Sequence, residues 1–576
     1  MKESLSATAL ASLNYDNLGR LSQSTGTTPT PAIAYVNNTA LATLAYAPTG
    51  AITGQSWSFP IGQKSITETN VLSQSGRVLQ NTLTDNAPNS ATSTASSTSY
   101  VSTYGYDAAG RLTAATVPDN TLTYSYQNTG GCGVNTSAGM DGNRTGYSNT
   151  TTGGTKASTT AVTVSYCYDN ADRLTADTVT GAPTGASPLL ANNLVSAAGS
   201  GAAGSGAAGS GQNLVYDAHG NTTLLADQTM SYDQAGRHLS TTTTGAGGAT
   251  ITYIRDVSDQ IVSMTTTMTT KNVASTTVHY SFGAGMQFTF NNSNTTVQEQ
   301  TISLPGGVTD SIRNTTAVWS YPNLHGDNIT TANKTGTRAS GPVAVYDPFG
   351  DPINLTTGQI GTLTANNQTM KNTTTPGAAY GWEGTHLKQT QQTADIATIE
   401  MGARQYIPLL GRFLTTDPVA GGNVNDYVYQ NDPINNTDII GMWSWDDTFA
   451  VAMIVLTVID FIPGLDIGSL ALQGVMLGVR AASIASKLEK ASEVARFAAQ
   501  NSKLIGEDSK LFGNFTMGRA NVPRPPGGLL NRRSASTKLG WSRDHNGAVF
   551  RLSSKHLPRK NKRGYGHIDI FRGRNW

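Results

Sequence analysis

The sequence predicts a mainly β fold of repeated hairpins, followed by an apolar helical segment and a small basic α+β C-terminal domain. Three observations predict it: a composition rich in Gly, Thr, Ser and Asn, a recurring Tyr-Asp turn, and a change of composition after about residue 442. Charged residues make up only 13% of the chain, while Thr and Tyr favour strands and Gly and Asn favour turns. At 576 residues the chain is too long for one ordinary domain, so we expect several units.

The Tyr-Asp turn is an internal repeat in which a strand ends in Tyr-Asp, a turn ends in Gly, and Arg or Asn begins the next strand. Asp can accept backbone N–H groups in such a turn, Gly can adopt positive φ, and Tyr can place its ring in the sheet interior. Flanking runs such as 121–126 and 161–166 alternate as half-buried strands do. The turn occurs at Tyr15–Leu21, Tyr106–Leu112, Tyr168–Leu174, Tyr216–Asn221 and Tyr232–Arg237, with a late variant at Tyr346–Gly350.

Other features of the first part are less specific. Residues 197–211 repeat Ala-Ala-Gly-Ser-Gly, which cannot bury a core, so we expect a flexible loop. Cys132 and Cys167 give no disulfide framework, and we expect two buried or incidental thiols. His325 is expected to be structural. The N-terminus lacks the apolar core of a classical signal peptide.

The segment Met401–Trp443 carries a signature that organises the chain. The residues of the signature are Gly402, Ala403, Arg404, Tyr406, Gly411, Arg412, Phe413, Asp417, Pro418, Tyr427, Tyr429, Pro433, Asp438 and Gly441. In this order they resemble the core that ends the shell of RHS/YD-repeat proteins, the polymorphic toxins of bacterial competition. The resemblance implies a wound YD-repeat β-shell over residues 1–400 and a core over 401–442.

The resemblance also implies that the core is an intramolecular aspartyl protease. Peptide hydrolysis of this kind uses one ionised and one protonated carboxylate. Asp438 matches the motif aspartate, Asp426 is the expected partner with Asp432 in reserve, and Arg404 or Arg412 would orient a carboxylate. The cut is expected between Met442 and Trp443. Ile439 replaces the family's proline, and the alternative is that these residues only terminate the shell.

Residues 443–517 are apolar and then amphipathic, and we expect a helical pretoxin segment there. Within it, 449–479 is interrupted by Pro463-Gly464 and two aspartates, which are costly in lipid. Two interpretations stay open: a helical hairpin that inserts into a target membrane, and a buried pair of helices. Residues 518–530 are expected to be a linker.

Residues 531–576 hold twelve Lys or Arg and two acids, which indicates a nucleic-acid partner, RNA more than DNA. We expect His556 and His567 to be the acid–base pair of a metal-independent ribonuclease that uses no cofactor. Lys555, Arg559 and Arg563 would stabilise charge on phosphate. Further nucleic-acid contacts are expected from Arg532, Arg533, Lys560, Lys562, Arg572 and Arg574.

The resemblance therefore implies a secreted or cell-surface bacterial effector whose C-terminal toxin acts in the cytoplasm of a target cell. It also implies a cognate immunity protein, for which an acidic surface would suit the basic toxin. Two alternatives remain: a cell-surface adhesion or carbohydrate-binding protein with an inert tail, and a toxin that cleaves DNA.

Overall fold

The computed structural model describes residues 2–441 and three C-terminal strands. The gaps within 2–441 are 6–7, 26–28, 61, 89–95, 197–211, 244–247, 257–258, 269–273, 284–285, 294–295, 314–315, 369, 371, 376–377, 392–395 and 419–422. The chain forms two compact units, Met1–Leu477 and Gly478–Trp576.

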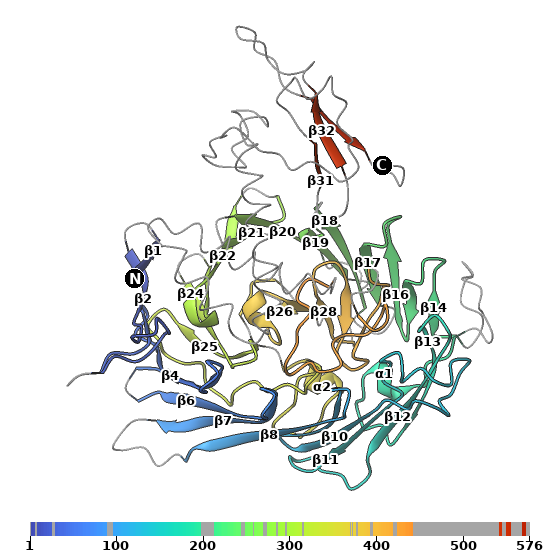
Figure 1. Cartoon of the computed structure of the whole chain (residues 1–576), viewed down its shortest axis with the longest axis horizontal. Coiled ribbons are helices and arrows are strands. Elements are labelled where there is room, and N and C mark those ends of the chain that lie inside the picture. The colour runs from blue at the N-terminus through green and yellow to red at the C-terminus, as the bar shows by residue number, and fades with distance from the viewer. Residues whose placement is uncertain are drawn as a thin grey trace. The chain divides into compact units, whose positions relative to one another are not determined.

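The first unit is built from antiparallel sheets in which each strand pairs with its neighbours in the sequence (Figure 1). A 13-stranded sheet contains β1 (Lys2–Leu5), β2 (Thr8–Leu13), β3 (Ile33–Tyr35), β4 (Ala40–Tyr46), β5 (Ile52–Ser58), β6 (Lys64–Leu72), β7 (Val78–Pro88), β8 (Thr98–Tyr106), β9 (Leu112–Val117), β10 (Asn120–Ser125), β11 (Gly146–Thr151), β12 (Val162–Tyr168) and β13 (Leu174–Thr180). A 12-stranded sheet contains β14 (Leu214–Tyr216), β15 (Thr222–Leu225), β16 (Gln228–Tyr232), β17 (His238–Thr243), β18 (Ala249–Arg255), β19 (Ile261–Met268), β20 (Thr276–Gly283), β21 (Met286–Phe290), β22 (Val297–Ser303), β23 (Thr309–Arg313), β24 (Thr316–Pro322) and β25 (Asn328–Asn333).

A third, five-stranded sheet includes the first strands of the core and lies between strands of the two large sheets in Figure 1. Helices in the described part are single turns: α1 (Pro188–Ala191), α2 (Leu363–Asn366), and the 3₁₀ turns η1 (Pro305–Gly307) and η2 (Gly384–His386). The third sheet contains β26 (Ala378–Ala379), β27 (Gln389–Gln391), β28 (Thr398–Glu400), β29 (Gln405–Ile407) and β30 (Arg412–Phe413). The expectation of a mainly β fold is confirmed for the described residues.

The Tyr-Asp turns have the geometry that the sequence predicts. In the first, Asp16 Oδ1 accepts the backbone N–H groups of Leu18 and Arg20, both at 2.9 Å, and Arg20 Nε donates to Asp16 Oδ2 at 2.8 Å. Gly19 has φ of 75°. The guanidinium of Arg20 lies 4.6 Å from the ring centre of Tyr46, which favours the same arrangement. The same Asp–Arg pair recurs at Asp107–Arg111, Asp169–Arg173 and Asp233–Arg237.

The two large sheets meet at both of their ends. Between β13 and β14, Tyr216 donates its hydroxyl to the Leu174 carbonyl at 3.0 Å. At the other end, the first sheet packs on the last strands of the second: the Tyr35 and Trp319 rings lie 5.8 Å apart, and those of Trp57 and Tyr321 lie 5.4 Å apart. Described residues 33–83 and 302–343 thereby share one apolar cluster.

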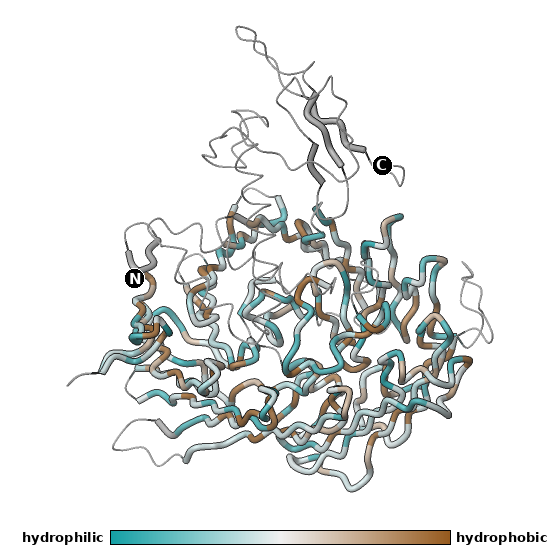
Figure 2. Tube along the Cα trace, in the orientation of Figure 1, coloured by the Kyte–Doolittle hydropathy of each residue, from teal (hydrophilic) through white to brown (hydrophobic). Residues whose placement is uncertain are grey.

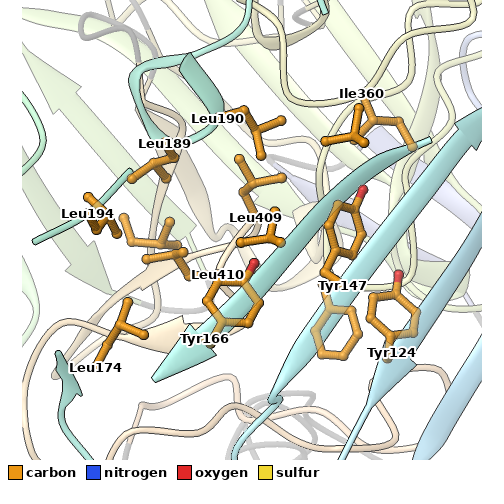
Figure 3. Close-up of a cluster of buried hydrophobic side chains, with 14 of the residues drawn as sticks. Tyr124, Tyr147, Tyr166, Leu174, Leu189, Leu190, Leu194, Ile360, Leu409 and Leu410 are labelled. Atoms are coloured by element: carbon orange, nitrogen blue, oxygen red, sulfur yellow. The ribbon is translucent and has the colours of Figure 1, made fainter. Parts of the chain in front are cut away.

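A second apolar cluster joins the first sheet to the core. Tyr124, Tyr147 and Tyr166 lie on the successive strands β10, β11 and β12, and the core residues Leu409 and Leu410 pack in the same cluster (Figure 3). Apolar residues occur in short stretches along many strands, with hydrophilic residues between them (Figure 2). Hydroxyl pairs such as Thr123 with Ser148, 2.7 Å apart, cover exposed parts of the sheets.

The structure corrects the expectation of two free thiols, because Cys132 and Cys167 form a disulfide with Cα atoms 4.7 Å apart. The loop before β11 returns to β12, where the Asn135 N–H donates to the Tyr168 carbonyl at 3.0 Å. The pairing depends on this return of the loop, because the two cysteines are 35 positions apart in the sequence.

In the second unit the described strands are β31 (Trp541–Arg543), β32 (Val549–Ser553) and β33 (His567–Phe571), which form one antiparallel sheet. They fall within residues 531–576, the range expected for the basic domain. In the described part of the chain, no helix has the length and apolarity needed to cross a membrane. The segments 443–517 and 518–530 lie outside the described residues, as does most of 531–576.

Asp310 on β23 supplies a test of the buried sheet face. Asp310 is only 3% exposed, and its Oδ1 atom has no hydrogen-bond partner. Burial raises the pKa of Asp310 to about 7, whereas an unfolded aspartate titrates near about 3.9. Between these values the folded chain binds the extra proton, so stability falls as pH rises from about 4 to about 7.

We therefore expect the free energy of unfolding of Asp310→Asn at pH 8 to exceed that of wild type by on the order of 2–4 kcal/mol. At pH 4 the two proteins should be nearly equal, because the wild-type carboxyl is then neutral in the folded state and only about half ionised in the unfolded state. Urea unfolding of both proteins at pH 4, 6 and 8 measures the difference. Two stability profiles that run parallel with pH would contradict this assignment.

Candidate functional site

The core segment, residues 401–441, surrounds an aromatic cluster. The rings of Tyr406 and Tyr429 lie 4.6 Å apart, and Trp382 lies 5.6 Å from Tyr406. Phe413 completes the cluster at 5.7 Å from Tyr406. Strand β29 carries Tyr406, β30 carries Phe413, and β28 pairs with β29. All four rings are at most 1% exposed, so the cluster is a water-excluding support for the polar groups beside it.

Arg404 lies next to this support and contacts four acceptors of the core. Its Nη2 atom lies 3.1 Å from Asp438 Oδ2 and 2.9 Å from Asp417 Oδ2. Its Nε donates to the Gly441 carbonyl at 2.5 Å, and Nη1 donates to the Asp426 carbonyl at 2.9 Å. The guanidinium also lies 3.7 Å from the ring centre of Phe413. One side chain thus joins two carboxylates to the backbone just before the expected cut.

The backbone that leads to the expected cut is held on both sides. The Asp438 N–H donates to the Tyr429 hydroxyl at 3.1 Å, and the Ala403 N–H donates to the Ile440 carbonyl at 3.0 Å. Gly402 has φ of 87°, and a Cβ at that position would come within 2.7 Å of the Ile440 carbonyl oxygen. Glycine is therefore required at residue 402 for the close approach of the two chain segments.

The charges of this site are almost completely buried. The side chains of Arg404, Asp438 and Asp417 are 1%, 0% and 2% exposed. Burial lowers the pKa of Arg404, and the carboxylates of Asp417 and Asp438 oppose that effect. Low local polarity strengthens the attraction between the guanidinium and the carboxylates and makes the loss of either partner costly.

The expected site residues occupy different positions relative to this centre. Asp438 and Arg404 lie in it, 3.1 Å apart. Asp426 contributes its carbonyl to Arg404, but the residue is exposed. Arg412 lies elsewhere: Nη2 donates to the Asp172 carbonyl at 2.7 Å, and the guanidinium lies over the rings of Tyr168 and Tyr427.

Asp432, the reserve candidate, is also separate from the centre. Its carboxylate pairs with Arg77 at 3.5 Å and accepts from Asn435 at 2.8 Å, while burial raises its pKa. Sequence reasoning missed Asp417 as a partner of Asp438, although the signature includes Asp417-Pro418. The available signal was that Asp417 and the proline after it both match the signature.

The C-terminal candidates are placed only in part. His567 begins β33, where it pairs in register with Ser553. Met442 and Trp443 lie outside the described residues. The same holds for His556, Lys555, Arg559, Arg563, Arg532, Arg533, Lys560, Lys562, Arg572 and Arg574. Among the residues that are described, no group of three His, Cys, Asp or Glu side chains could hold a metal ion.

Comparisons with known proteins find similar solved structures at low identity. The crystal structure of TcdB2–TccC3 has a TM-score of 0.46 and 18% identity, covering 76% of this chain and 20% of that chain. The TcdB2–TccC3–Cdc42 structure has a TM-score of 0.46 and 17% identity, covering 83% and 20%. The Photorhabdus luminescens Tc holotoxin pore has a TM-score of 0.36 and 15% identity, covering 75% and 21%.

This chain therefore spans about a fifth of the length of the solved chains that it matches. No protein-family model and no curated protein matches the chain. At these identities and TM-scores, the likeness carries no conclusion about the activity of this chain.

The geometry of Arg404 predicts that lysine cannot replace it. Arg404→Lys keeps the charge, but one ammonium cannot reach four acceptors arranged around a planar guanidinium. We expect a loss of about 3–5 kcal/mol in the free energy of unfolding, because the two buried carboxylates lose their contacts with the guanidinium.

Arg20→Lys is the matched control, since Arg20 pairs with one aspartate and its side chain is 35% exposed. It should cost about 0–1 kcal/mol. Urea unfolding of both variants measures the difference. Equal, small losses would show that the four contacts of Arg404 contribute little to stability.

Proposed function

We propose that this chain is a self-processing toxin container of RHS type, whose core cuts the backbone and frees a basic C-terminal toxin. The observation that carries the proposal is the contact of the Arg404 guanidinium with Asp438, Asp417 and the Gly441 carbonyl. Two buried carboxylates on one nitrogen, next to a fixed peptide carbonyl, supply the groups that peptide hydrolysis requires.

In the proposed reaction an ionised aspartate accepts a proton from the water that attacks the scissile carbonyl carbon. The other aspartate, protonated, donates to the leaving amide nitrogen. Two carboxylates close together favour this sharing of one proton, because like charges raise one of the two pKa values. Arg404, whose Nε donates to the carbonyl of the preceding residue Gly441, would stabilise negative charge as it develops on the scissile Met442 carbonyl oxygen.

The proposed cut is after Met442, one residue beyond the carbonyl that Arg404 contacts. Asp438 is the motif aspartate, and the burial of Asp417 supports it as the partner over the exposed Asp426. Ile439, which replaces the family's proline, is 8% exposed, and packing can restrict this backbone where a proline ring would do so in the family.

Self-cleavage is tested by purifying the full chain and measuring fragment masses. We expect wild type to give one fragment ending at Met442 and one beginning at Trp443. Asp438→Asn and Asp417→Asn should each remain intact, because a neutral amide can neither accept nor donate the required proton. Asp426→Asn, a substitution of the same kind at an exposed site, should be cut like wild type.

The outcome assigns the second carboxylate directly. If Asp426→Asn stays intact and Asp417→Asn is cut, then Asp426 is the partner of Asp438. If wild type and Asp438→Asn are equally intact, the core terminates the shell without cutting it, and the processing part of the proposal fails.

For the released segment we propose a metal-independent ribonuclease that acts in the cytoplasm of a target cell and is neutralised by an acidic immunity protein. The support is the excess of twelve Lys or Arg over two acids in residues 531–576, together with His556 and His567. Imidazoles of ordinary pKa can act as base and acid on a ribose hydroxyl and its leaving oxygen.

Induction of the full chain in a bacterial cytoplasm tests this activity. We expect growth arrest with loss of RNA, and the double variant His556→Ala, His567→Ala should restore growth at equal protein level. Cleavage of RNA in vitro should persist in EDTA. Loss of DNA would indicate a DNase, and normal growth with the wild-type chain would support an adhesive protein with an inert tail.

A further inference from the structure

The turn between β24 and β25 differs from the Tyr-Asp turns in the position of its carboxylate. Its first residue is Asn323 and its last is Asp327, where the five Tyr-Asp turns between residues 15 and 237 begin with Asp and end with Arg or Asn. Asn323 Oδ1 accepts the N–H groups of Gly326 and Asp327 at 2.9 and 2.8 Å, so the turn keeps its shape. The carboxylate now lies at the end of the turn, where it is available to His325.

His325 is fixed at both ring nitrogens. Nδ1 lies 2.9 Å from Asp327 Oδ1, and Nε2 lies 2.8 Å from the Pro433 carbonyl oxygen. Asp327 Oδ1 also accepts the Glu383 N–H at 3.0 Å, which orients the carboxylate. Both partners of the imidazole are acceptors, so both nitrogens donate and the ring is an imidazolium.

The electrostatics agree with this assignment. Burial alone would lower the pKa of His325, but the Asp327 carboxylate and the more distant Glu383 raise it to about 10. The ring also lies 5.8 Å from that of Trp382, the residue that opens the aromatic cluster of the core. The charged His325 ring therefore makes two hydrogen bonds, which connect a turn of the second sheet to the core.

Pro433 belongs to a short strap, residues 431–436, that precedes Asp438. The first sheet holds the strap from the other direction. The Leu112 N–H donates to the Asn431 carbonyl at 2.8 Å, and the Val78 N–H donates to Asn435 Oδ1 at 2.9 Å. The strap is thus fixed between the two large sheets, and His325 supplies a contact from the second.

We propose that His325 is a positioning residue of the processing centre, which fixes the strap through the Pro433 carbonyl and thereby sets the position of Asp438. The inference rests on the proposed self-cleavage. Asp327 orients the imidazole, as an acceptor on the second nitrogen does at other functional histidines. His325 acts through the backbone and does not touch the scissile bond.

Two amide substitutions separate this role from a general structural one. In His325→Gln the amide nitrogen takes the position of Nε2 and can still donate to Pro433. In His325→Asn it takes the position of Nδ1 and can donate to Asp327 only. Both remove the charge. His219, an exposed histidine at the same place in another turn, provides matched controls through His219→Asn and His219→Gln.

We expect His325→Asn to cut itself at least about tenfold more slowly than wild type, since small misplacements of catalytic groups cost this much or more. His325→Gln should stay within about threefold of wild type. The His219 variants should match wild type. Amide hydrogen exchange of peptides covering 434–441 should be faster in His325→Asn than in His325→Gln.

Equal cleavage and equal exchange in the two His325 variants would overturn the proposal, because only one of them can contact Pro433. If wild type proves uncut, cleavage cannot separate the variants and the processing proposal has failed on its own. The exchange of 434–441 still decides whether His325 fixes the strap: faster exchange in His325→Asn supports that role, and unchanged exchange overturns it.

Discussion

The buried guanidinium of Arg404 is the interaction on which the core depends. Taking one cation and two carboxylates out of water costs several kcal/mol for each ion, and only close, well-oriented contacts offset that cost. Arg404 meets this condition at Asp438 and at two backbone carbonyls, to which its planar fork donates, while Asp417 Oδ2 lies 2.9 Å from the same Nη2 atom. The ring of Phe413 covers its face at 3.7 Å. A buried charge arrangement of this kind therefore contributes little net stability for the number of groups it orders.

The two large sheets around the core are built from hairpins whose turns form their hydrogen bonds internally. Each Tyr-Asp turn satisfies its own backbone: Asp16 caps two N–H groups and pairs with Arg20 four residues later. Similar turns therefore recur at irregular spacing without disturbing the sheet. Hydroxyl pairs such as Thr123 with Ser148 cover exposed positions without charge, which accounts for the low charged content of the chain.

The core and the shell stabilise each other through contacts that are distant in the sequence. Leu409 and Leu410 pack against the tyrosines of the first sheet, while His325 reaches the Pro433 carbonyl from the second. The strap between residues 431 and 436 is held from both sheets, and Asp438 follows directly after it. The position of a candidate catalytic carboxylate is thus decided by two sheets that the chain completes long before it reaches residue 438.

The sequence by itself determined the mainly β fold and the Tyr-Asp hairpins, because these follow from local hydrogen bonding. It left Arg404 and Arg412 as alternatives for orienting a carboxylate, and the structure places Arg404 on Asp438. Only the tertiary structure decided that Asp417, not the carboxylate of Asp426, contacts Arg404, and that Cys132 meets Cys167. It also decided that His325 contacts the Pro433 carbonyl oxygen, 108 residues away in the sequence. Spacing along a chain specifies which groups share a turn or a strand face. The contacts between different sheets depend on how all the hairpins pack together. Local sequence patterns do not predict that packing.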